Sequence, residues 1–153
     1  MFNLDIIITF VPIGISLGLG VIVYAKNKKN LSNKIFGGLC LALILWAATN
    51  YLSIHPSWFP ALFWIRVVML FAVFLQLMFF LFVYLFPQNH IPALNLKFSS
   101  LLFLTLATML ASISPFLYSK LNEGSIPVPG PLMPLFAFTI FLFWGLSAFY
   151  VIK

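Results

Sequence analysis

The chain has 153 residues, of which 63% are hydrophobic, 18% aromatic and only 7% charged. A soluble domain carries about a quarter charged residues, so this chain has too little polar surface to cover a globule in water. Its formal charge of +6 is spread over short segments and forms no single basic face, which argues against a nucleic-acid-binding protein. The composition therefore indicates an integral membrane protein.

The first long apolar run covers about residues 6–25 and would reach about 30 Å as a helix, enough to cross a bilayer. It contains Gly14 and Gly18 at GxxxG spacing, a pattern that favours close packing against another helix. Directly after it comes the lysine cluster, which holds half of the eight basic residues: Lys26, Lys28, Lys29 and Lys34. Such clusters stay on the cytoplasmic side, so the N-terminus is predicted to lie outside the cell.

Four more apolar runs are predicted to cross the membrane, at about residues 35–53, 61–86, 98–118 and 132–152. The alternation puts Lys97 and Lys153 on the cytoplasmic side with the lysine cluster, and Lys120 alone outside. We therefore expect an all-α fold of one domain, residues 1–153: a multi-pass bundle of five transmembrane helices in the plasma (inner) membrane, with a cytoplasmic C-terminus. Short loops predict that sequential helices pack as antiparallel neighbours.

Polar residues inside apolar runs are the first candidates for a site. Arg66 lies near the outer end of the third run, where it could reach lipid headgroups, pair with the second helix, or contact a ligand. Gln76 lies ten residues further on, about 15 Å deeper, and is expected to bond another helix or to line a pocket. Asn50 and Thr49, near the outer end of the second run, lie within possible reach of Arg66. The candidate ligand-binding or interhelical polar residues are Asn50, Arg66 and Gln76.

Other polar residues favour structural roles. Thr105, Thr108 and Ser112 share one helical face and are expected to bond the backbone of their own helix. Three outer residues, Asp5, His55 and Glu123, lack the spacing of metal ligands, so no metal site and no cofactor is predicted. His90 is expected in a cytoplasmic loop, and Cys40 is expected to pack as a small apolar residue. No matched set of acid, base and nucleophile indicates catalysis.

The second and third runs carry a more specific order of residues. A loop with asparagine and lysine leads into a helix with a central tryptophan; after a short loop, Ala-x-x-Trp-x-Arg opens the third run, which closes with Phe-Pro. In this order the chain resembles the N-terminal seven-helix membrane region of bacterial histidine kinases, most clearly over residues 14–87. The resemblance rests on Asn30, Asn33, Lys34, Phe36, Trp46, Ala61, Trp64, Arg66, Phe82, Phe86 and Pro87. A proline common midway along the family's third helix is missing near Gln76.

The resemblance implies a membrane module that passes an outside stimulus to cytoplasmic histidine kinase or cyclic-dinucleotide output domains of a two-component system. The chain has five runs where the family has seven, with no phospho-accepting histidine in a cytoplasmic helix and no ATP-binding glycine boxes, so a non-catalytic input module is expected. It would be either a piece of a longer sensor or a five-helix relative that pairs with other membrane proteins. A membrane scaffold or accessory subunit and a transporter subunit are the alternatives. The expected partners are the lipid bilayer with its anionic headgroups, a cytoplasmic output domain or membrane protein, and a second copy of the chain.

Overall fold

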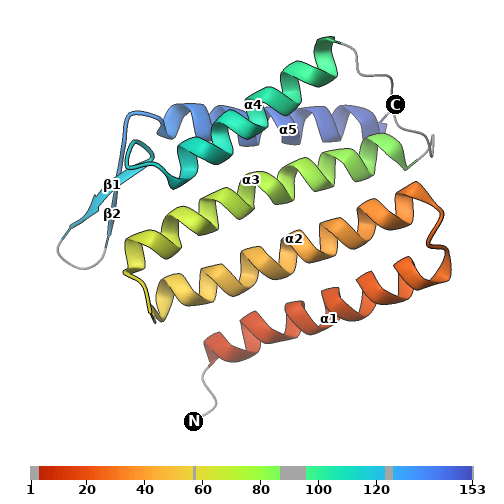
Figure 1. The fold of residues 1–153 in the computed structure, drawn as a ribbon, viewed down its shortest axis with the longest axis horizontal. Helices are drawn as coiled ribbons and strands as arrows, with labels where there is room; N and C mark the ends of the chain where they lie inside the picture. The colour runs from red at the N-terminus through yellow and green to blue at the C-terminus, as the bar shows by residue number, and fades with distance from the viewer. Residues whose placement is uncertain (1–3, 57, 87–95, 123–125, 153) are drawn as a thin grey trace.

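The computed structural model describes residues 4–56, 58–86, 96–122 and 126–152. Within these ranges the chain forms five helices and one antiparallel β-hairpin (Figure 1). The elements are α1 (Leu4–Lys26), α2 (Leu31–Ile54), α3 (Ala61–Leu85), α4 (Leu96–Ile113), β1 (Tyr118–Leu121), β2 (Pro127–Pro129) and α5 (Met133–Ile152). The predicted helical bundle is confirmed, and the hairpin is an addition to it.

Helix α3 occupies the middle of the bundle (Figure 1). On one side it packs against α2, which in turn packs against α1; on the other side it packs against both α4 and α5. The hairpin lies at the end of the bundle where α3 begins, which we call the hairpin end. The opposite end, which carries the turn between α1 and α2, is called the lysine end. The predicted antiparallel packing of sequential helices holds for α1, α2 and α3.

Four of the helices, α1, α2, α3 and α5, are long and apolar enough to cross a membrane. The apolar helix α4 is shorter, with 18 residues and so about 27 Å of length. Large apolar side chains point outward on every helix, among them Ile22 on α1 and Phe141 on α5, which are 65% and 76% exposed. A surface of this kind is suited to lipid rather than water, as expected of a membrane protein.

Prolines and an asparagine set the helix boundaries that differ from the expected ones. Helix α2 begins at Leu31 rather than residue 35, because the Asn30 side chain accepts hydrogen bonds from the amides of Ser32 and Asn33. Helix α4 ends at Ile113, where residue 118 was expected, since a residue before proline disfavours the helical conformation and Pro115 follows Ser114. In α1, by contrast, the helix continues through Pro12.

Backbone hydrogen bonds join the two arms of the hairpin at its base, between the end of α4 and the start of α5. The Gly130 amide donates to the Leu117 carbonyl at 2.7 Å, and the Leu132 amide donates to the Phe116 carbonyl at 3.1 Å. A Cβ atom at Gly130 would overlap the carbonyl group of Phe116, so this close approach requires glycine. The expected loop after the fourth run is thus an ordered element, whose register pairs Tyr118 with Pro129.

Candidate functional site

Arg66 joins α3 to the hairpin. Its Nε and Nη2 atoms donate hydrogen bonds of 3.2 and 2.7 Å to the carbonyl oxygen of Tyr118, the first residue of β1. The Arg66 side chain is half-buried, and the Tyr118 residue is only 7% exposed. A guanidinium group presents several donors in a fixed fork, so it can hold one carbonyl oxygen with two of them. Arg66 is therefore the polar link between the central helix and the hairpin.

Pairing of Arg66 with the second helix, one of the three possibilities that the sequence left open, does not form in the described part of the chain. The Thr49 hydroxyl instead donates to the carbonyls of Leu45 and Trp46 in its own helix, at 2.8 and 3.0 Å. Asn50 is half-buried, and its backbone carbonyl accepts a hydrogen bond from the Ser53 hydroxyl. Sequence reasoning placed Arg66 near one end of its helix, where the structure has it. It missed the partner of Arg66, because the hairpin was expected to be a loop.

Gln76 lies ten residues beyond Arg66 in α3, about 15 Å along the helix and about 80° around it. Its side chain is half-buried and makes no hydrogen bond among the described residues, so the expected bond to another helix is absent there. Asn50, Arg66 and Gln76 therefore do not converge on a shared polar cluster. Their role as ligand-binding residues stays a prediction.

Buried hydroxyl groups share one face of α4, and one of them reaches α5. Thr105, Thr108 and Ser112 each donate to the carbonyl four residues earlier, at 2.8 Å in all three cases, which confirms the prediction for this stripe. Sequence reasoning did not single out Thr139 in α5, whose Oγ1 atom lies 3.0 Å from that of Thr108. Ser147, two turns further along α5, is 2% exposed, and its hydroxyl has no hydrogen-bond partner among the described residues.

Asp5 and His55 meet at the hairpin end, as their common side of the membrane predicted. The Asp5 Oδ2 and His55 Nε2 atoms lie 3.8 Å apart, and both side chains are largely exposed. Glu123, the third residue expected on that side, and His90, expected in a cytoplasmic loop, lie outside the described residues. Among the residues described, no group of three histidine, cysteine or acidic side chains could hold a metal ion.

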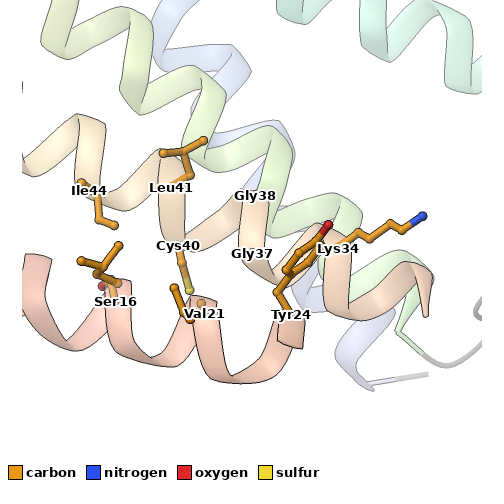
Figure 2. A pocket seen from close by; sticks show the side chains of 11 residues that line it. Ser16, Val21, Tyr24, Lys34, Gly37, Gly38, Cys40, Leu41 and Ile44 are labelled. Carbon is orange, nitrogen blue, oxygen red and sulfur yellow. The ribbon is translucent and has the colours of Figure 1, made fainter. Parts of the chain in front are cut away.

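A groove runs along the surface between α1 and α2, from the lysine end toward the middle of the bundle (Figure 2). Its volume is about 330 Å³, and its walls come from residues 16–24 of α1 and 34–44 of α2. The walls are mostly apolar, with Ser16 at the inner end and with Lys34 and Tyr24 at the mouth, which is at the lysine end. Cys40 lies on this wall with a buried side chain, as the sequence predicted for a small packing residue.

No protein-family model matches the chain, and no curated protein or solved structure is significantly similar to it. The resemblance to the membrane region of histidine kinases therefore stays a prediction. What the structure adds is local: it assigns Asn30 of that pattern to a helix cap and Arg66 to the hairpin link.

Proposed function

We propose that the chain is a membrane-embedded, non-catalytic input module of a signalling system. In this proposal the hairpin end faces the outside of the plasma membrane and receives the stimulus, and the lysine end faces the cytoplasm. The observation that supports it is the pair of hydrogen bonds from Arg66 to the Tyr118 carbonyl. A stimulus that moves the hairpin would pull directly on α3.

Helix α3 is well placed to pass such a movement on. Its 25 residues extend about 37 Å, long enough to reach from the hairpin end to the lysine end. It also packs against α2, α4 and α5, so a shift of α3 changes three helix interfaces at once. In this mechanism the stimulus binds more tightly to one of two arrangements of the helices than to the other. The output would be a cytoplasmic domain or a membrane partner that contacts the lysine end.

Hydrogen exchange of the protein in lipid nanodiscs tests this coupling. The variant Arg66→Gln removes the charged donor, and a hydrogen bond to a charged group is worth about 1.5–3 kcal/mol, so amides at the hairpin base should exchange tenfold faster or more. If α3 carries the signal, amides at the far end of α3, near Leu85, should also lose protection. Lys120→Gln is the matched control, because Lys120 is an exposed cation in the hairpin. It should leave both regions unchanged.

Two results would contradict the coupling. One is faster exchange confined to the hairpin, with the far end of α3 as protected as in the wild type. The other is unchanged amide exchange in both regions of Arg66→Gln, which would show that the hydrogen bonds to Tyr118 are dispensable. Arg66→Lys distinguishes charge from shape, since lysine keeps the charge but lacks the planar fork. We expect it to restore protection only in part.

A scaffold role is the second candidate, and one observation favours it. Gly14 and Gly18 of α1 have open space where a Cβ atom would stand, so the α1 surface can accept another helix at close range. If the chain is a scaffold, α1 amides should be better protected in native membranes than in nanodiscs that hold this protein alone. The Arg66→Gln variant should then have no effect on that difference.

A further inference from the structure

The groove between α1 and α2 has the length of one membrane leaflet. Its α1 wall extends over nine residues from Ser16 to Tyr24, a rise of about 12 Å, and its α2 wall over eleven residues from Lys34 to Ile44, a rise of about 15 Å. The hydrocarbon core of a bilayer is about 30 Å thick, so one leaflet contributes about 15 Å. The groove thus begins at the lysine end and stops near the bilayer middle, as a site for a lipid acyl chain would.

The mouth of the groove carries positive charge, and no acidic side chain lies beside it in the part of the chain that the structure describes. Lys34 stands at this mouth, and its side chain extends away from the groove toward the lysine end (Figure 2). The only acidic residues of the sequence are Asp5 and Glu123, and Asp5 begins α1, about 30 Å from Lys26 at its other end. Beside Lys34, Tyr24 presents a ring with a polar tip, a side chain common at the headgroup level of membranes. An anion is therefore the complementary ligand.

We propose that this groove binds an anionic phospholipid, with one acyl chain along the apolar walls and the phosphate beside Lys34. The proposal does not depend on the signalling role. Lipid fits better than a second copy of the chain, because a two-fold dimer in the membrane would bring two lysine clusters together at the same end. Like charges at close range repel, whereas a lipid phosphate neutralises the charge.

Native mass spectrometry of the purified chain, titrated with phosphatidylglycerol and with phosphatidylcholine of the same acyl chains, tests the site. We expect one phosphatidylglycerol to remain bound, with an apparent Kd at least fivefold below that for phosphatidylcholine. Lys34→Gln should weaken phosphatidylglycerol binding about fivefold, the effect of one basic residue near an anionic surface. Lys28→Gln is the control at the same end, because Lys28 does not line the groove, and its effect should stay below about twofold.

A filled groove provides the second arm. At Gly37 a Cβ atom would have its nearest neighbour at 3.9 Å, on Tyr24, so Gly37→Leu can fold and fill the groove near its mouth. It should abolish the bound lipid, while Gly145→Leu, at an open position on α5, should not. Val21→Trp fills the groove from the α1 side, where Val21 is 58% exposed, and serves if Gly37→Leu does not fold.

Three outcomes would overturn the proposal. The first is unchanged lipid retention in both groove-filling variants. The second is an equal loss in Lys34→Gln and Lys28→Gln, which would mean that lipid is attracted to the surface and not held in the groove. The third is a dimer in the wild type that becomes a monomer in Gly37→Leu without any change in bound lipid, which would assign the groove to a second copy.

Discussion

The Oγ1 atoms of Thr108 in α4 and Thr139 in α5 lie 3.0 Å apart in the bundle interior, where both residues are fully buried. Each hydroxyl also lies within hydrogen-bond distance of a carbonyl of its own helix, that of Leu104 or Leu135. The two hydroxyls hold two protons for three contacts, so one of them donates across the interface while the other donates to its own backbone. This hydrogen bond ties the shortest helix to the bundle.

Thr108→Val should therefore destabilise the bundle more than Thr105→Val. The Thr105 hydroxyl contacts only its own helix, whereas the Thr108 hydroxyl lies within hydrogen-bond distance of both its own helix and α5. Interhelical hydrogen bonds in membrane proteins are worth about 0.6–1.7 kcal/mol, which sets the expected difference in free energy of unfolding. Unfolding in mixed micelles, followed by circular dichroism over a series of detergent ratios, measures it.

The double variant Thr108→Val, Thr139→Val supplies the check on this assignment. Removing both partners leaves no unpaired hydroxyl, so the double variant should be less destabilised than the sum of the two single variants. Strict additivity would mean that the two hydroxyls do not interact. Equal effects of Thr105→Val and Thr108→Val would lead to the same conclusion.

Gly130→Ala should loosen the base of the hairpin. The added Cβ atom would overlap the carbonyl of Phe116, a backbone group that cannot rotate away as a side chain can. Overpacking of this kind costs about 1–3 kcal/mol. We expect lower stability in the same unfolding assay and faster exchange of the Leu132 amide, which donates to that carbonyl. Gly145→Ala, at an open position, should be neutral or slightly stabilising, and a neutral Gly130→Ala would refute the packing argument.

The helices were predictable from the sequence because an apolar run of about 20 residues can cross a membrane as a helix, which pairs its backbone polar groups within the segment. The predicted end of the fourth helix was wrong, because hydrophobicity alone extends the helix to Tyr118 whereas Pro115 stops it at Ile113. The hairpin was missed because Pro127 and Pro129 lack amide protons and argue against a strand. The amides that close the hairpin belong to other residues, Asn122 and Gly130.

The candidate site was predictable only as a position. Hydrophobicity patterns place Arg66 near one end of its helix, but its acceptor is a backbone carbonyl 52 residues away. Every residue carries such a carbonyl, so residue types hold no signal for which one is used. The groove could not be predicted from the sequence either, because it depends on how α1 and α2 pack against each other along residues 16–24 and 34–44.

Asn30→Ala should destabilise the start of α2. The Asn30 Oδ1 atom accepts hydrogen bonds from the amides of Ser32 and Asn33, at 2.8 and 3.4 Å, and so caps two N–H groups of the first turn. Loss of an N-cap side chain costs about 1 kcal/mol. The detergent unfolding assay should detect this loss, and Asn30→Ser should restore most of the stability because serine also caps. If serine and alanine behave alike, the cap contributes nothing.

Tyr118 should make the hairpin sensitive to alkaline pH. Burial raises the pKa of the Tyr118 phenol above the ordinary value for tyrosine, because the charged phenolate is poorly solvated there. The unfolded chain then releases its proton first as pH rises, so the stability is intact below the ordinary tyrosine pKa of about 10 and falls as pH rises from there through the folded pKa. Tyr118→Phe removes the ionisable group and should flatten this decline.

The measurement is an absorbance titration of tyrosinate in wild type and Tyr118→Phe, paired with hydrogen exchange of the hairpin amides at pH values on both sides of the transition. The difference between the two titrations isolates Tyr118 from the other four tyrosines. A difference curve centred at or below the ordinary tyrosine value would show that the phenol is solvated. In that case the Tyr118 side chain is not buried when the protein is in the membrane, and water could reach the hydrogen bonds from Arg66 to the Tyr118 carbonyl.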